Sequence, residues 1–135
     1  MPLEKSMLIA AAGMKAQGTR LRVIAENVAN ANSTAQAPGG DPYRRKVVTF
    51  HNVFDREMQA RIVTPRRVRE DMSDFGLAYD PAHPAANADG YVKKPNVNVL
   101  IEMTDMREAQ RSYEANLNMI DVTKGMLAAT INLLR

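Results

Sequence analysis

Cysteine and tryptophan are absent from this chain of 135 residues, and aromatic residues make up only 5% of it. Without cysteine the chain has no disulfide bond, no thiolate ligand for a metal and no cysteine nucleophile. The few aromatic side chains argue against a large self-contained core, although 45% of the residues are hydrophobic. The composition therefore favours one small domain, or a small domain with an extension.

Long hydrophobic runs are also missing, since no stretch approaches the roughly 20 apolar residues of a membrane-spanning helix. The apolar run at 7–14, which follows Lys5, resembles the central part of a signal peptide. It is short for that purpose, and its apolar pattern continues in register past Gly18, so we expect a retained helix. A formal net charge of +3 favours no particular class of partner for the whole chain.

Patterns typical of catalysis or metal binding do not occur. His51 and His83 each lie near one carboxylate and have no second partner at ligand or triad spacing. The sequence NADG at 87–90 resembles part of a calcium loop, but it lacks the first acid and the closing glutamate. We therefore expect no catalytic residue, no cofactor, no small-molecule substrate and no metal site.

Two long heptad patterns are what the chain has instead. The first predicts a helix from residue 3 to about 31, with a coiled-coil seam sustained for about four heptads. Asn30 or Asn32 is a candidate to end the helix by adopting the left-handed conformation, which has a positive φ. APGG at 37–40 prevents the helix from continuing. The seam of this first helix consists of Leu3, Met7, Ala10, Met14, Gln17, Leu21, Ile24 and Val28.

The second heptad pattern begins after Pro95, where Asn96 or Asn98 can cap the helix N-terminus. It predicts a helix that extends to the end of the chain. Its stripe consists of Val99, Met103, Met106, Gln110, Tyr113, Leu117, Ile120, Lys124, Leu127, Ile131 and Leu134.

Residues 35–96 differ in character from both helices. Short β-favouring runs at 46–50, 61–63 and 67–69 are separated by Pro, Gly and Asp turns, and Asp89-Gly90 is a hairpin-type turn signal. The predicted fold is mainly α, with long N- and C-terminal helices that pair as a coiled-coil-like rod domain around a small irregular β-rich insertion. The predicted divisions are 1–34 for the N-terminal helix, 35–96 for the insertion and 97–135 for the C-terminal helix.

A basic segment at 43–69 supports a different class of function. Eight Lys or Arg residues between 44 and 69 oppose only Asp55 and Glu57, and Tyr43, Phe50 and Phe54 are interleaved with them. Basic strands with aromatic residues can bind single-stranded nucleic acid. Residues 102–121 have an acidic excess, so contact between copies is the other interpretation of this segment.

Three blocks of the sequence resemble the bacterial flagellar basal-body rod proteins. They are AAGMKAQGTRLRVIAENVANANS, GGDPYRRKVVTF and DGYVKKPNVNVLIEMTDMREAQRSYEANLNMI, and the first contains an N-x-A-N motif at 27–30. Within that family YVKKPNVN and RSYEANLN are similar to the proximal-rod members. The blocks cover roughly 11–50 and 80–135, and residues 51–79 carry no matching block.

The resemblance implies a non-enzymatic subunit of a hollow periplasmic rod that transmits torque and conducts later components. It implies partners among copies of the same chain, other rod proteins, the basal-body ring and the export apparatus at the rod base. It also implies export by the flagellar type III system without a cleaved signal peptide. A helical adaptor that forms a closed dimer is a further alternative, with a defined dimer as its signature.

The two predicted helices have more apolar and small-residue surface than one pair can cover, which indicates an association face. Asparagines near the helix ends are candidates for hydrogen bonds between subunits, or for solvent-facing helix caps. The predicted assembly interface consists of Met7, Met14, Gln17, Leu21, Ile24, Asn27, Val28, Asn30, Asn32, Asn98, Met103, Met106, Gln110, Tyr113, Asn116, Leu117, Asn118 and Ile120.

Overall fold

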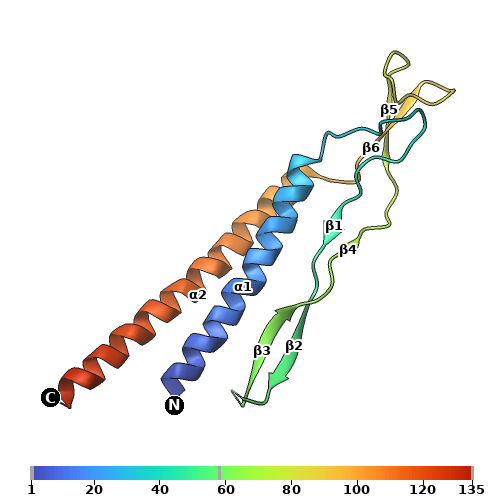
Figure 1. The fold of residues 1–135 in the computed structure, drawn as a ribbon. Coiled ribbons are helices and arrows are strands. Elements are labelled where there is room, and N and C mark those ends of the chain that lie inside the picture. The colour runs from blue at the N-terminus through green and yellow to red at the C-terminus, as the bar shows by residue number, and fades with distance from the viewer. Residues whose placement is uncertain (1, 58, 135) are drawn as a thin grey trace. The chain divides into compact units, whose positions relative to one another are not determined.

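The computed structural model describes residues 2–57 and 59–134, which form two long helices and, between them in the sequence, a small β-rich region (Figure 1). Helix α1 spans Pro2–Ala29 and helix α2 spans Val99–Leu133. The two helices and the β-rich insertion are confirmed. The strands are β1 (Lys46–Val47), β2 (Phe50–Asp55), β3 (Ala60–Pro65), β4 (Arg69–Glu70), β5 (Gly76–Tyr79) and β6 (Tyr91–Lys94).

The contacts of the chain group into two units, and each long helix contributes to both. Unit 1 comprises Met1–Leu21, Val48–Arg67 and Arg107–Arg135. Unit 2 comprises Arg22–Val47 and Val68–Met106. Unit 1 therefore holds most of both helices, and unit 2 holds the end of α1 and the start of α2.

Each strand pairs with one antiparallel partner, which gives three two-stranded sheets. In unit 1 β2 and β3 form a hairpin, and in unit 2 β1 pairs with β4 and β5 with β6. Asp89-Gly90 lies at the end of the long loop between β5 and β6, where Gly90 has a φ of 82°. This positive φ, and the proximity of Tyr79 and Pro81 to any added Cβ, explain why glycine is needed there.

Asparagine side chains cap the facing ends of both helices. Asn98 Oδ1 accepts hydrogen bonds from the backbone N–H groups of Leu100 (3.1 Å) and Ile101 (3.5 Å), so Asn98 is the N-cap of α2. At the end of α1, Asn30 Nδ2 donates to the carbonyl oxygen of Glu26 at 2.8 Å. Neither Asn30 nor Asn32 has a positive φ, so the predicted left-handed stop is wrong. The Asn30 side chain instead adds a second donor to the Glu26 carbonyl oxygen, which also accepts the backbone N–H of Asn30 at 3.1 Å.

The buried faces of the helices differ from the predicted seams. In α1 only Ala10 and Ile24 of the eight seam residues are buried, and the other six are half-buried. In α2 none of the eleven stripe residues is buried. The fully buried residues of α2 are Glu102, Ala109 and Thr123. They are separated by multiples of seven residues, and each lies one position before a residue of the predicted stripe. At Glu102, hydrogen bonds with distant segments select this face.

Within unit 1 the two helices run side by side in opposite directions (Figure 1). Arg20 forms an ion pair with Glu108 at 3.6 Å, and Gly13 lies against Asn116. A Cβ atom added at Gly13 would be 2.8 Å from Asn116 Oδ1, so the absence of a side chain allows the close approach.

Candidate assembly site

Asn27 is the centre of a polar cluster in unit 2 and is only 1% exposed. Its Nδ2 donates to the carbonyl oxygen of Lys46 at 2.8 Å and to Glu102 Oε2 at 3.0 Å. Its Oδ1 accepts from the Tyr43 hydroxyl and from the backbone N–H of Lys46, both at 2.9 Å. The amide thus makes four hydrogen bonds within the chain, so Asn27 is not available to a neighbouring subunit.

Glu102 is also 1% exposed, and its charge is paired inside the same cluster. Arg45 Nε donates to Glu102 Oε1 at 2.6 Å, and the same guanidinium reaches Asp71 at 3.4 Å and Asp105 at 3.9 Å. Burial disfavours the charge of Arg45, but the hydrogen bonds and attraction of Glu102 and Asp71 outweigh it and raise the pKa of Arg45. The carboxylate and guanidinium join the start of α2 to β1 and its flanking segment.

Three further hydrogen bonds hold the same segment. Asn96 Oδ1 accepts from the backbone N–H of Arg45 at 2.7 Å, and Asn96 Nδ2 donates to the carbonyl oxygen of Asp71 at 2.9 Å. Lys46 donates to Glu26 at 3.1 Å. This hydrogen bond is the main reason why the pKa of Glu26 lies below its ordinary value of 4.5.

The first three basic residues of the predicted nucleic-acid-binding segment form contacts within the chain. Arg44 donates to the carbonyl oxygens of Asp71 (3.2 Å) and Ser73 (3.0 Å), and its guanidinium lies 4.1 Å from the centre of the Phe75 ring. Arg45 and Lys46 are bound to carboxylates. Nothing in the described geometry favours binding of nucleic acid, because these side chains stabilise unit 2 instead.

The predicted interface residues fall into three groups by exposure. Asn27 and Ile24 are buried. The half-buried residues are Met7, Met14, Gln17, Leu21, Val28, Asn30, Met106, Tyr113, Asn116 and Ile120. The exposed residues are Asn32, Asn98, Met103, Gln110, Leu117 and Asn118.

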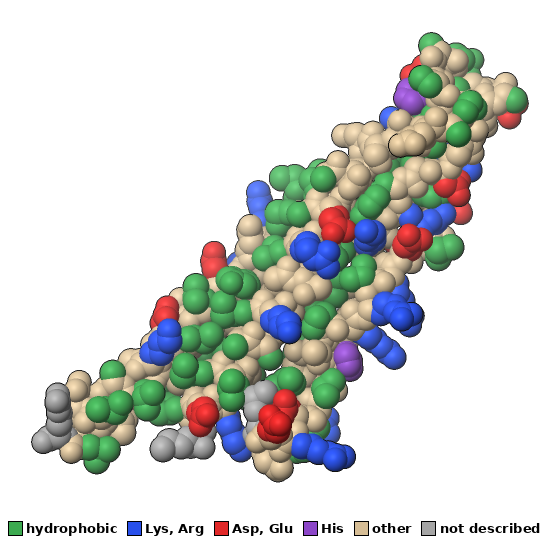
Figure 2. Space-filling view, viewed as in Figure 1, with side chains coloured by type: hydrophobic (Ala, Val, Ile, Leu, Met, Phe, Trp, Pro, Cys, Tyr) green, Lys and Arg blue, Asp and Glu red, His purple; other side chains and the backbone are tan. Residues whose placement is uncertain are grey.

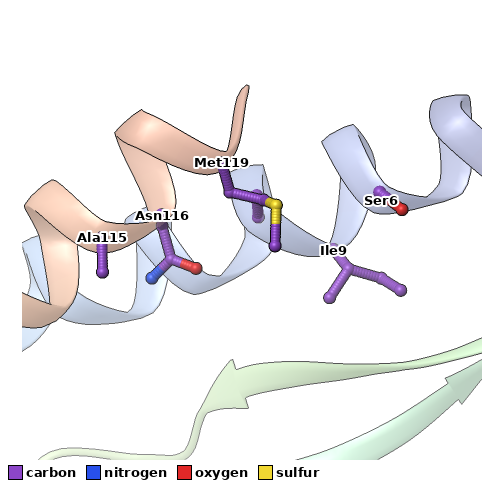
Figure 3. Close-up of a pocket in the computed structure, with 6 residues that line it drawn as sticks. Ser6, Ile9, Ala115, Asn116 and Met119 are labelled. Carbon is purple, nitrogen blue, oxygen red and sulfur yellow. The ribbon is translucent and has the colours of Figure 1, made fainter. Parts of the chain in front are cut away.

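A groove follows the α1–α2 contact in unit 1 (Figure 3). Met119 and Asn116 project from α2 into it beside Ile9 of α1, and its volume is about 350 Å³. A second groove of about 330 Å³ shares Ile9, Ala115 and Asn116 with the first and reaches Gln17 and Val63. Neither groove is lined by a charged side chain. Both suit apolar or neutral polar side chains.

Large apolar side chains are exposed along the part of α2 that belongs to unit 1. Figure 2 shows hydrophobic side chains gathered over this part of the surface. They recur on more than one face of the helix, which is typical of an association surface. The largest exposures are those of Met119, Val122, Met126, Ile131 and Leu133, together with Leu134 directly after the helix, each above half.

Sequence patterns alone did not identify Arg45, Tyr43 or Glu102 as members of a buried cluster. A weak signal was present on α2, because Glu102, Ala109, Asn116 and Thr123 are spaced by seven residues. A series of residues spaced by seven marks one face of a helix. The more hydrophobic series beside it carried the stronger signal.

The described residues offer neither a metal site nor a membrane span. Across residues 2–57 and 59–134, no three His, Asp or Glu side chains are grouped as ligands of an ion. Neither α1 nor α2, as far as the structure describes them, is apolar enough over a sufficient length to cross a bilayer. The exposed apolar side chains of α2 suit contact between proteins.

Comparison with known families supports that role at both ends of the chain. Residues 7–36 match the family model described as "Flagella basal body rod protein". Residues 88–133 match the model described as "Flagellar basal body rod FlgEFG protein C-terminal". The two long helices thus carry the sequence features of flagellar rod proteins.

Curated relatives match almost the whole chain. The flagellar basal-body rod protein FlgC of Agrobacterium fabrum is 52% identical over 134 residues, which cover 99% of this chain and 96% of the relative. The FlgC proteins of Bacillus subtilis (39% identity, 95% of each chain) and Salmonella typhimurium (40% identity, 93% and 92%) are also similar. The chain belongs to the FlgC family of flagellar basal-body rod proteins.

Proposed function

We propose that this chain is a structural subunit of the proximal part of the flagellar basal-body rod. In this proposal it assembles with copies of itself and with other rod proteins through α1 and α2. The observation that carries the proposal is 52% identity to a FlgC protein over 99% of the chain. The exposed apolar residues of α2 support it, because an isolated soluble protein rarely exposes so many on one helix.

The proposed assembly surface is the set of predicted interface residues without Asn27 and Ile24, which are buried within the chain. The exposed stripe of α2, which includes Met103, Gln110 and Leu117, is proposed to pair with helices of neighbouring subunits in a coiled-coil-like way. Exposed amides such as those of Asn32 and Asn118 are proposed to set the register of these contacts. Residues 1–34 and 97–135 are the proposed rod domain, with 35–96 as its insertion.

The proposed location is the periplasmic rod, reached by flagellar type III export without a cleaved signal peptide. The proposed neighbours are other rod proteins, the basal-body ring and the export apparatus. A contact between two different surfaces of identical subunits does not close on itself and yields an open helical array. We propose that such an array forms the hollow tube that transmits torque and conducts exported subunits, with no catalytic step.

Deletion and complementation of the gene test this function. We expect the deletion strain to stop flagellar construction before any hook appears, and a plasmid copy to restore basal bodies seen by electron microscopy. Hooks and swimming in the deletion strain would contradict the proposal. Normal rods in material purified from the deletion strain would also contradict the proposal.

A further inference from the structure

The sheet formed by β5 and β6 in unit 2 has one covered edge and one open edge (Figure 1). The outer edge of β6 is covered by the loop that precedes it. There the Asn87 N–H donates to the Tyr91 carbonyl oxygen at 2.9 Å, and the Tyr91 N–H donates to Asn87 Oδ1 at 2.9 Å. None of the described strands pairs with the outer edge of β5. The open edge therefore belongs to β5 alone.

The backbone groups of Leu77 and Tyr79 point out of this open edge. In an antiparallel pair, opposed residues direct their N–H and C=O groups either both toward the partner strand or both away from it, and the two cases alternate along the strand. Tyr79 is opposite Tyr91, whose groups bond on the far side of β6. The hydrogen bond from the Asp80 N–H to the Gly90 carbonyl oxygen at 3.0 Å fits the same alternation. Leu77 and Tyr79 thus present free donors and acceptors to a further strand.

The sequence of β5 carries none of the usual protections of an edge strand. Proteins commonly keep exposed edges from pairing with other chains by placing charged residues or proline in them. Lysine, arginine or aspartate occurs in each of the other five described strands, whereas β5 has the sequence GLAY. Leu77 is 65% exposed and Tyr79 is 68% exposed. The open edge of β5 is therefore both uncharged and apolar.

We propose that β5 pairs antiparallel with β5 of a second copy, with Ala78 on the two-fold axis. In this register Leu77 of each copy lies opposite Tyr79 of the other, and each such pair exchanges backbone hydrogen bonds. The two small sheets become one continuous sheet, which is more stable than an isolated two-stranded one. The contact lies in the insertion, involves neither long helix and does not rest on the proposed rod function.

The residues beside β5 select this register. A register that places Leu77 opposite Leu77 of the second copy also places Asp74 opposite Asp80, and like charges that oppose each other destabilise a sheet. The shift in the other direction places Leu77 opposite Pro81, which has no N–H to donate. The proposed register places Asp80 opposite Gly76 and avoids both faults. The strand is thus complementary to itself, as a two-fold contact requires.

An engineered cysteine tests the pairing, because the chain has none of its own. Ala78 would oppose Ala78 of the second copy at a position without hydrogen bonds, where Cα atoms are about 4.5 Å apart and a disulfide bond can form. Mild oxidation of full-length Ala78→Cys should give a linked dimer on a non-reducing gel, and nothing larger.

The matched control is Leu77→Cys, which places the thiol on the same strand at a more exposed position. Its counterpart in the second copy lies on the diagonal, about 7–8 Å away, which is too far for a disulfide bond without a shift of the backbone. Leu77→Cys should therefore form the linked dimer at least tenfold more slowly. Equal or faster linking of Leu77→Cys, or no linked dimer of Ala78→Cys, would overturn the pairing.

Sedimentation velocity measures the same contact without a cross-link. Leu77→Lys puts a charge on the open edge and should weaken self-association at least tenfold. Its urea midpoint should not change, because the Leu77 side chain is mostly exposed. The control Met72→Lys alters an exposed apolar residue of unit 2 outside β5 and should change self-association less than about twofold. Equal weakening by the two variants, or an unaltered chain that stays monomeric at millimolar concentration, would contradict the proposal.

Discussion

Asn27 Nδ2 donates to Glu102 Oε2 at 3.0 Å, and both residues are 1% exposed although 75 positions separate them in the chain. The bond joins the last turns of α1 to the first turn of α2 inside unit 2. Arg45 completes the pair by donating to the other carboxylate oxygen. The N-x-A-N motif of the sequence therefore has a structural use at its first asparagine, where it satisfies a buried charge within the chain.

Replacing Asn27 should destabilise unit 2 strongly. Asn27→Leu removes four hydrogen bonds and leaves Glu102 with one fewer donor, so we expect a loss of about 3 kcal/mol in the free energy of unfolding. Urea denaturation followed by circular dichroism measures it. The control Asn32→Ala changes an exposed asparagine and should stay within about 0.5 kcal/mol. Equal effects of the two variants would contradict the assigned role of Asn27.

Glu102→Gln tests the ion pair with Arg45. Glutamine has one acceptor oxygen and cannot serve Asn27 and Arg45 together, so we expect a loss of about 2 kcal/mol. The control is Glu108→Gln, which removes a 68% exposed partner of Arg20 and should cost less than about 1 kcal/mol. A larger loss for Glu108→Gln would mean that burial does not decide the strength of these pairs.

Two glycines of α1 should respond oppositely to alanine. A Cβ at Gly18 meets nothing within 4 Å, so Gly18→Ala should stabilise the helix by up to about 1 kcal/mol. A Cβ at Gly13 would be 2.8 Å from Asn116 Oδ1, and the Asn116 amide donates to the Ser112 carbonyl at 2.8 Å. Gly13→Ala must displace that amide and should therefore be less stable than Gly18→Ala by about 1 kcal/mol or more. Thermal unfolding of both variants checks the order.

Lowering the pH should destabilise unit 2. The pKa of Glu26 is lowered from 4.5, chiefly by the hydrogen bond from Lys46, and the pKa of Asp71 is lowered from 3.8, chiefly by the backbone N–H of Ser73. Groups with a lowered folded-state pKa contribute stability above the unfolded value, and this contribution disappears as pH falls through the folded value.

The melting temperature should therefore be nearly constant from pH 7 to about 5 and fall below about 4.5. The variant Glu26→Gln should melt slightly lower at neutral pH and show a shallower acid decline, since its titrating group is gone. High salt should reduce the difference in melting temperature between Glu26→Gln and the unaltered chain, because both carboxylates are partly exposed to solvent. If the melting temperature of Glu26→Gln falls as steeply with acid as that of the unaltered chain, the Glu26 carboxylate does not contribute to the pH dependence.

The exposed stripe of α2 should govern assembly and not folding. Leu117 is 42% exposed, and Leu117→Glu should leave the circular dichroism of the monomer unchanged. A charge placed in an apolar contact should reduce the number of basal bodies per cell at least tenfold in a complementation assay. The control Glu114→Gln alters a neighbouring exposed residue and should complement fully. Normal swimming of Leu117→Glu would remove this stripe from the proposed interface.

Helix limits could be read from the sequence because their causes are local. The apolar periodicity runs along each helix, and the cap Asn98 directly precedes the first residue of α2. The predicted β-favouring runs contain β1 and overlap β2, β3 and β4, whereas β5 and β6 lie outside them and were not predicted. The buried face of α2 was not predictable in this way. The apolar stripe and the series through Glu102 and Ala109 differ by one residue, and local hydrophobicity favours the stripe.

The sequence by itself thus determined two long helices, a β-rich insertion and, through its motifs, the rod-protein family. Only the tertiary structure decided which helix face is buried, because burial of Glu102 is tolerable only where Arg45 and Asn27 come from 57 and 75 residues away to satisfy it. It likewise decided that Asn27 acts within the chain while Gln17 keeps an unsatisfied oxygen in an uncharged groove. Hydrogen bonds between distant segments depend on where folding places each group. These positions cannot be read directly from the order of residues along the chain.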